Sequence, residues 1–89
     1  MPRKSKKHPR PTVTYKKLGQ SKAVGFAYTD KNPPLIELDE RLYGRRHLEV
    51  LCHETAHCFF PDLPEKTVEE FGYYMRDVLW KEGYRQIIE

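Results

Sequence analysis

The sequence predicts an α+β fold in which a short N-terminal β-sheet of about three strands packs on two antiparallel helices. Between residues 12 and 39, apolar and polar residues alternate in short segments separated by turn-forming residues, which is the pattern of strands. From residue 44 onward, apolar residues recur every three or four positions, which is the pattern of amphipathic helices. A chain of 89 residues forms a single domain with a small core.

Three segments carry the strand pattern. TVTYKKL and AVGFAYT, at residues 12–18 and 23–29, flank the turn-prone sequence GQSK, so we expect them to pair as a β-hairpin with Gly19 in the turn. The third strand, LIELD at residues 35–39, follows Pro34 and runs into the polar sequence DER.

Two segments carry the helical pattern. The first, RRHLEVLCHETAHCFF, begins at about Gly44 and is ended by Pro61, because proline cannot donate the hydrogen bond that continues a helix. The second, PEKTVEEFGYYMRDVLWKEG, ends at about Gly83, and the short connection makes the two helices antiparallel neighbours. The residues predicted to face the core are Leu48, Leu51, Cys52, Thr55 and Phe59, followed by Val68, Phe71, Met75, Val78 and Leu79.

The N-terminal residues differ in composition from the rest of the chain. Residues 1–11 contain three prolines, five lysines or arginines and His8, and we expect a mobile basic arm because they offer no apolar face. The domain is then residues 12–89. Residues 1–17 carry seven of the 16 Lys and Arg residues and none of the 13 Asp and Glu residues. Such an arm either contacts nucleic acid through its phosphates or is a solvated tail that keeps the protein soluble.

Two further features bear on location. No apolar run approaches the ~20 residues that cross a bilayer, and the basic start is followed by no hydrophobic signal segment, so we predict a cytoplasmic protein with no membrane partner. Cys52 and Cys58 are six positions apart, a spacing that fits no common zinc pattern, and we interpret them as reduced thiols near the core.

The sequence HETAH at residues 53–57 predicts a zinc site. Because a helix advances 3.6 residues per turn, His53 and His57 project from one face about a turn apart and can ligate one metal ion. Glu54 lies beside them, where it can take a proton from a water held by the metal. These residue types in this order are typical of a metal-dependent hydrolase.

One more protein ligand is needed, since a catalytic zinc takes three and leaves a fourth position for water. At a rise of ~1.5 Å per residue, Glu69 on the second helix lies at about the depth of the histidine pair, so it is the preferred ligand. Glu65 is the alternative, but with Asp62 it resembles a capping box that would engage its carboxylate with the helix start. Glu70, Asp62 and a ligand from outside the chain are weaker candidates. Gly72, on the flank of Glu69, predicts a close approach of the helices at the metal.

Residues 35–85 resemble the small zincin metallopeptidases of the gluzincin type. More narrowly, they are similar to the compact phage and bacterial minigluzincins, relatives of the ImmA/IrrE-like and SprT-like groups, which combine a short sheet, a helix with HExxH and a following helix that supplies a glutamate. The resemblance implies Zn²⁺ at His53, His57 and Glu69, with Glu54 as the general base. It also implies that the strand LIELD borders the active-site cleft and pairs with an extended peptide.

The leading hypothesis is a zinc-dependent metallopeptidase that hydrolyses a protein or peptide bound as an extended strand beside residues 35–39. Peptide hydrolysis needs a group that stabilises the developing oxyanion, and the candidates are Tyr73 first, then Tyr74 and Arg76. The alternative is a zinc-stabilised binding or regulatory module without catalysis, whose basic arm contacts nucleic acid or an acidic partner. A third hypothesis is a metal-free interaction domain in which HETAH arose by coincidence.

Overall fold

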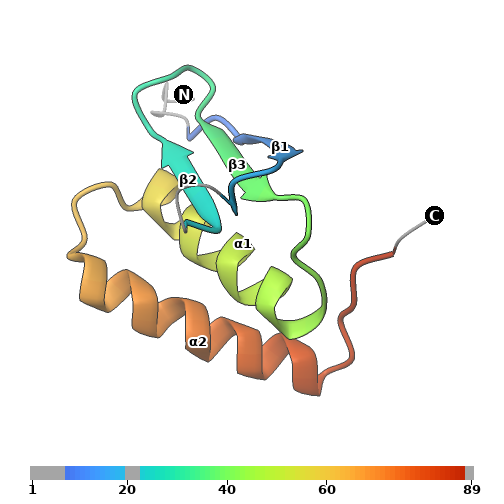
Figure 1. The fold of residues 1–89 in the computed structure, drawn as a ribbon. Coiled ribbons are helices and arrows are strands. Elements are labelled where there is room, and N and C mark those ends of the chain that lie inside the picture. The colour runs from blue at the N-terminus through green and yellow to red at the C-terminus, as the bar shows by residue number, and fades with distance from the viewer. Residues whose placement is uncertain (1–7, 20–22, 88–89) are drawn as a thin grey trace, which may run out of the picture.

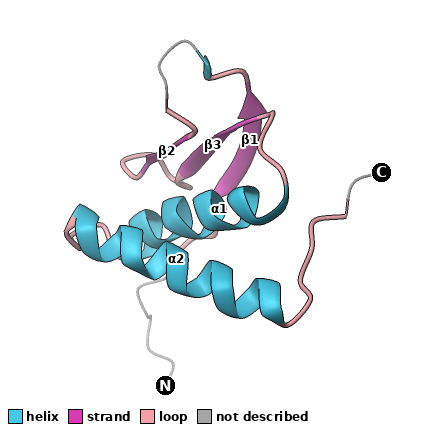
Figure 2. Cartoon of the chain, turned by 60° about the horizontal axis from the view of Figure 1, so that its bottom comes forward, coloured by secondary structure: helices cyan, strands magenta, loops and turns pink. Residues whose placement is uncertain are grey.

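The computed structural model describes residues 8–19 and 23–87 of the chain and has the predicted α+β fold (Figure 1). Its elements, in chain order, are β1 Thr12–Lys16, β2 Gly25–Tyr28, β3 Leu35–Asp39, α1 Gly44–Phe59 and α2 Glu65–Lys81. Helix α1 lies between the sheet and α2, so that the domain has three layers (Figure 2). None of the helices in the described residues is both long and apolar enough to span a membrane.

The sheet has β3 at its centre. The strand order is β1-β3-β2, with β1 parallel and β2 antiparallel to β3. The predicted hairpin between the first two strands is therefore wrong, and the last three residues of its turn, residues 20–22, lie outside the described residues. Burial explains the order: β3 contributes the fully buried Ile36 and Leu38, whereas all five residues of β1 are exposed. The most apolar strand takes the position that is covered on both edges.

A peptide cannot pair with β3, because both of its edges are already paired within the sheet. The expectation that LIELD would receive an extended peptide is therefore wrong. Within residues 8–19 and 23–87, the strand next to α1 that has an unpaired edge is β2, whose partner in the sheet is β3. Any strand added beside α1 must add to β2.

Helix α1 buries a different set of residues from the predicted stripe. Thr55 and Phe59 are exposed, and the other three residues of that stripe are half-buried. The buried residues are instead His47, Val50, Glu54 and Ala56. Because α1 packs against the sheet on one side and α2 on the other, it has no single apolar face, and two of its buried positions carry polar side chains that a hydrophobic pattern does not count.

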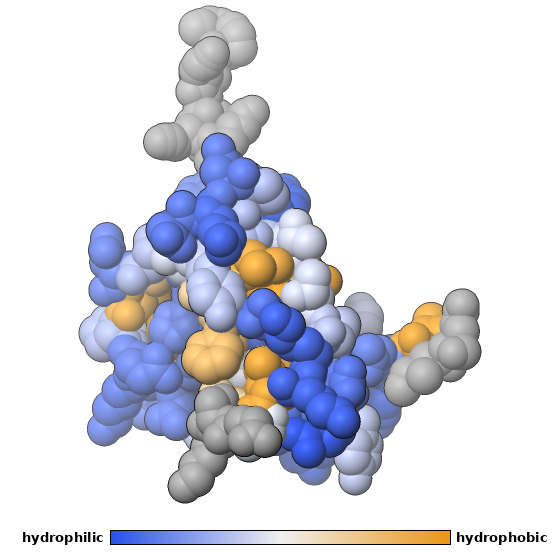
Figure 3. Space-filling model, turned by 45° about the horizontal axis from the view of Figure 1, so that its top comes forward, coloured by the Kyte–Doolittle hydropathy of each residue, from blue (hydrophilic) through white to orange (hydrophobic). Residues whose placement is uncertain are grey.

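The core is small. Ile36, Leu38 and Val50 form its centre, and the half-buried side chains packed around them are Val24, Leu42, Leu51 and Cys58. Both cysteines are free and half-buried, and burial raises the pKa of each thiol. On the face seen in Figure 3, apolar side chains reach the surface as small patches between hydrophilic ones.

Helix α2 packs on α1 through Val68 and Gly72, which are its buried residues. Phe71 and Val78, which the sequence pattern assigns to the core, are exposed. A Cβ added at Gly72 would lie 3.3 Å from the backbone oxygen of Glu49 and 3.4 Å from the Cβ of His53. The predicted close approach of the helices at Gly72 is confirmed, and it occurs at the first histidine of the motif.

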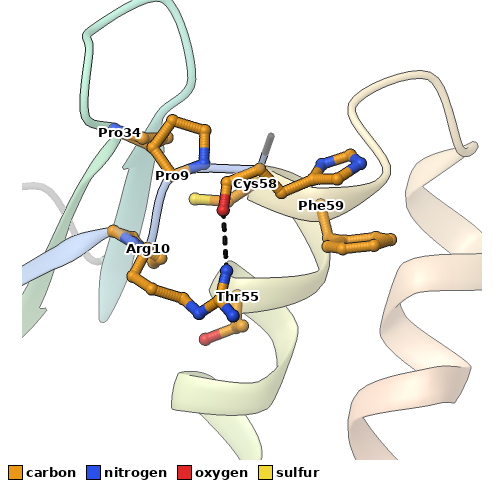
Figure 4. Close-up of a pocket in the computed structure, with 8 residues that line it drawn as sticks. Pro9, Arg10, Pro34, Thr55, Cys58 and Phe59 are labelled. Atoms are coloured by element: carbon orange, nitrogen blue, oxygen red, sulfur yellow. Dashed lines mark hydrogen bonds between the residues drawn. The ribbon is translucent and has the colours of Figure 1, made fainter. Parts of the chain in front are cut away.

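The last residues of the predicted arm lie on the domain. The His8 ring stacks on Phe59 with the centroids 4.1 Å apart, and Arg10 donates a hydrogen bond to the backbone oxygen of His8. Beside this contact, the segment and α1 enclose a hollow of about 310 Å³, and Thr55 and Cys58 line its helical side (Figure 4). The rest of the arm, residues 1–7, lies outside the described residues.

Candidate metal centre

The two histidines of HETAH project from α1 toward the start of α2. Their rings lie 4.9 Å apart between centroids and meet edge to face, as helical positions i and i+4 allow. Both side chains are largely buried, with 19% of His53 and 24% of His57 exposed. The pair is therefore held in place by packing, with one side open.

Glu65 occupies that open side. Nε2 of His53 lies 3.1 Å from one carboxylate oxygen of Glu65, and Nε2 of His57 lies 2.9 Å from the other. Three potential ligand atoms from these residues all lie within 4.8 Å of one another. Among the residues that the structure describes, this is the one group of three or more His, Cys, Asp or Glu side chains with this property.

The group fits a zinc ion in donor type and spacing. Zinc in proteins takes imidazole nitrogens and carboxylate oxygens at ~2.0–2.2 Å, so that ligand atoms in a tetrahedral site lie roughly 3.3 Å apart. Nε2 of His53 and Nε2 of His57 lie 3.1 and 2.9 Å from different oxygens of the Glu65 carboxylate, and the three candidate ligand atoms lie within 4.8 Å of one another, so small side-chain shifts would bring them to that spacing. Two nitrogens and one oxygen also leave a fourth position for water or substrate.

Glu69, the preferred third ligand in the sequence, lies one turn farther along α2. Its carboxylate accepts a hydrogen bond of 3.3 Å from the Tyr73 hydroxyl, and it does not belong to the group at the histidines. The side chains of Glu70 and Asp62 are exposed and also lie outside this group. The structure thus brings Glu65 to the histidines in place of Glu69.

The sequence favours Glu69 on two grounds, and the structure differs on both. The expected capping box is absent, because the N-cap of α2 is Pro64 and no side chain caps the helix, so the carboxylate of Glu65 is not engaged with backbone amides. The comparison of positions along the helix axis also assumes that each carboxylate lies level with its own Cα. The Cα of Glu65 lies about 4 Å from the level of the histidine pair along the axis, and a side chain with three rotatable bonds can span that distance.

Glu54 lies against the same site from inside the domain. Only 8% of this residue is exposed, and burial raises the pKa of its carboxyl group, which the neighbouring histidines partly oppose. A Cβ added at Gly25 would lie 3.2 Å from the Cγ of Glu54 and 2.9 Å from the Cγ1 of Val50. Glycine in β2 therefore allows the strand to approach α1 directly over Glu54.

Two adjoining hollows form a groove along α1. The first, which we call the metal hollow, has a volume of about 380 Å³ and is lined by Gly25, Phe26, Ala27, Thr29, His53, Glu54, His57, Pro61 and Glu65. The second, the side hollow, has about 270 Å³ and is lined by Val24, Arg46, Glu49, Val50, His53, Glu54, Glu69 and Tyr73. Both share His53 and Glu54. The groove has α1 as its floor, β2 on one side and α2 on the other.

Of the three oxyanion candidates, Tyr73 lies at the groove. Its side chain lines the side hollow, and the charge of Glu69, followed by burial, raises the pKa of its hydroxyl. Tyr74 is 73% exposed and lines neither hollow. Arg76 lies over the Tyr73 ring and pairs with Glu49 and with Asp77.

Three of the groove residues that sequence reasoning missed shape it most directly, namely Gly25, Arg46 and Glu49. Gly25 lies in a segment with a strand pattern, and the lack of a side chain is the one feature of the sequence that indicates a close approach of this strand to another element. Arg46 and Glu49 precede His53 by seven and four positions, which is helical spacing, so a wheel extended backward from the motif would have found them. The other two histidines of the chain, His8 and His47, do not belong to the metal group.

His47 has a different role. It is buried, its Nε2 is joined to the Tyr15 hydroxyl by a hydrogen bond of 2.9 Å, and burial lowers its pKa.

Comparison with known proteins gave no match to a family model, a curated protein or a solved structure.

Proposed function

We propose that this chain is a minimal zinc-dependent metallopeptidase of the gluzincin type. The observation that carries the proposal is the convergence of His53, His57 and Glu65 within 4.8 Å, beside a buried carboxylate and at the floor of a groove with an open strand edge. A metal-binding helix pair alone would need neither the buried acid nor the groove.

The residues that would hold the ion are His53, His57 and Glu65. Bound there, Zn²⁺ supplies Lewis acidity, which acidifies water and polarises a substrate carbonyl. The two histidines fix the position of the ion on one rigid helix. Glu65 comes from the second helix and closes the site from the other side.

Glu54 acts as the general base. It takes a proton from the attacking water, and it later gives that proton to the amine nitrogen that leaves when the peptide C–N bond breaks. Burial favours this role, because the raised pKa makes the carboxylate a stronger base than an exposed one. Glu54 is not a ligand in this scheme, since the histidines on either side of it point to Glu65.

The substrate binds as an extended strand beside β2. The unpaired edge of β2 offers backbone donors and acceptors to a peptide backbone, which gives affinity without regard to sequence. The groove runs from Arg46 to His57, a span of roughly 16 Å along the helix. That length accommodates about five residues of extended peptide.

Tyr73 is the proposed donor to the oxyanion. It lines the hollow that adjoins the metal site and shares His53 and Glu54 with it. Its hydroxyl donates to Glu69 in the structure. It must therefore turn from Glu69 toward the substrate as the reaction proceeds.

A zinc-stabilised binding module is the second candidate, and the small core favours it. In the described part of the chain, the fully or nearly fully buried apolar residues are Ile36, Leu38, Val50, Ala56 and Val68. A metal that joins α1 to α2 would stabilise such a domain. Contact of the basic arm with nucleic acid stays a prediction from the sequence.

The two candidates are separated by Glu54→Gln, which keeps the shape of the side chain and removes the base. Parent and variant, each with its zinc content measured, are incubated with an unfolded protein and a peptide library, and products are identified by mass spectrometry. For a peptidase, the variant retains zinc and loses hydrolysis by a factor on the order of a hundred or more. Equal cleavage by both proteins would reject Glu54 as the base. No cleavage by the zinc-loaded parent would favour the binding module.

A further inference from the structure

The side hollow adjoins the metal hollow and lies on the path of a peptide bound beside β2. His53 and Glu54 line both hollows. A peptide that runs along β2 over the metal site therefore places a side chain in the side hollow, close to the scissile bond. The residues of this hollow are in a position to select among substrates.

Two valines form the apolar part of the side hollow, beside His53 and Glu54. Val50 is 5% exposed and belongs to the core, and Val24 packs against that core. This apolar part suits the methylene stem of a long side chain. A short polar side chain would leave it uncovered.

The charges around the hollow are paired unequally. Glu49 is held between two arginines, with Arg46 at 3.2 Å and Arg76 at 3.0 Å, so its charge is compensated. Glu69 accepts a hydrogen bond from Tyr73, but among the described residues no basic side chain pairs with it. Glu54 also lines the hollow but is buried, so among the described residues Glu69 is the exposed carboxylate of the hollow that has no basic partner.

We propose that the side hollow is a specificity pocket for a lysine or arginine side chain of the substrate, with Glu69 as the residue that recognises the positive charge. This inference rests on the proposed peptidase function and names its substrate class. The valines cover the aliphatic stem, and the ammonium or guanidinium group reaches Glu69 in a charge-assisted hydrogen bond. An acidic side chain would meet Glu69 with the same sign, and Arg46 is already bound to Glu49.

The charge of the domain itself has to be separated from the effect of the pocket. Seven of the 16 Lys and Arg residues lie in residues 1–17, whereas all 13 Asp and Glu residues lie beyond them, so residues 18–89 are net acidic. The general field of these residues attracts basic peptides whatever the position of the positive charge. A contribution of Glu69 is therefore recognised by its dependence on the position of the lysine and by its absence from a variant that removes a neighbouring charge.

The test measures binding and cleavage separately. Capped heptapeptides that differ at one position in lysine, norleucine or glutamate, with that position moved along the sequence, are titrated into zinc-loaded Glu54→Gln and into the same protein with Glu69→Gln. Binding is followed by NMR chemical shifts, and cleavage of the same peptides by the parent is followed by mass spectrometry. Glu70→Gln is the matched control, because it removes the same charge one position away and Glu70 lines neither hollow.

We expect lysine to bind more tightly than norleucine by about threefold to tenfold at one position, the range of a partly exposed charged contact. Glu69→Gln should remove this selectivity, and Glu70→Gln should keep it. Equal selectivity with and without Glu69, no selectivity, or a preference for glutamate would each overturn the pocket. Lysine selectivity that depends on Glu69 without any cleavage would support the pocket and reject the peptidase. Cleavage without lysine selectivity would support the peptidase and reject the pocket.

Discussion

Nε2 of His57 lies 2.9 Å from the carboxylate of Glu65, and this contact joins the last turn of α1 to the first turn of α2. A metal bound there ties the two helices together. Glu65→Ala should therefore weaken zinc binding by more than about a hundredfold, beyond the usual cost of an outer-shell change, and lower the melting temperature of the zinc-loaded protein.

Glu69→Ala is the control for that prediction, because it removes a carboxylate one turn away. It should leave the zinc content unchanged, as measured by competition with a chromogenic chelator. Loss of zinc in Glu69→Ala with retention in Glu65→Ala would show that Glu69 is the ligand.

The close contact at Gly72 predicts a second effect on the metal site. Gly72→Val places new carbon atoms against the backbone of Glu49 and against His53, which forces α2 away from α1. Overpacking of this kind costs about 1–3 kcal/mol of unfolding free energy, and zinc affinity should fall with it because Glu65 moves with α2. Tyr74→Val, at an exposed position of the same helix, controls for the helix propensity of valine. Urea unfolding curves that match for the two variants would contradict the prediction.

Asp39 predicts a dependence of stability on acid. Its buried carboxylate accepts hydrogen bonds from the backbone of Leu18 and from the backbone and guanidinium of Arg41. The Arg41 side chain is the main cause that holds the pKa of Asp39 well below its ordinary value. The stabilisation is thus present above the unfolded pKa and is lost as the pH falls through the folded one. Asp39→Asn should be clearly less stable than the parent at pH 7, and the difference should shrink toward pH 2 in denaturant titrations.

His47 predicts a change at milder pH. Burial lowers the pKa of its imidazole, and the described residues that line its hollow, among them Tyr15, Tyr84 and Arg85, include no carboxylate. The unfolded chain then binds the proton first, so unfolding free energy is fully retained above about pH 6.5 and decreases below it. The slope is at most about 1.4 kcal/mol per pH unit for one proton. His47→Gln should lack this decrease in unfolding free energy between pH 7 and 5. Identical profiles of unfolding free energy against pH for the parent and the variant would contradict the prediction.

The sequence alone was sufficient to predict the strands and helices and the part of the candidate site that lies on α1. Local period and helix-ending residues located three strands and two helices, because these depend on nearby residues. HETAH indicated which side chains of α1 share a face, since helical spacing alone determines that. The identity of the third ligand depends on how α2 begins and how far a glutamate side chain reaches, which the spacing of residues in one helix does not determine.

The errors in the fold have a similar cause. The hairpin between residues 12–18 and 23–29 is inferred from their proximity in sequence, but the strand that both contact is β3. In this sheet the central position belongs to the strand that carries the fully buried Ile36 and Leu38. In α1, Glu54 and His47 occupy buried positions that a count of apolar residues assigns to the surface.

The order β1-β3-β2 also has a consequence for how the chain folds. Strands β2 and β3 are neighbours in sequence and α1 follows at once, so these three elements can assemble from short-range contacts. The pairing of Thr12 with Leu35 spans a longer loop, and loop closure of that kind is the slower step. We therefore expect β1 to dock last, during and after synthesis. Until it does, β3 presents an unpaired edge, on which a second chain can place its own N-terminal strand. Exchange of β1 between two molecules is thus the misassembly to which this topology is most open.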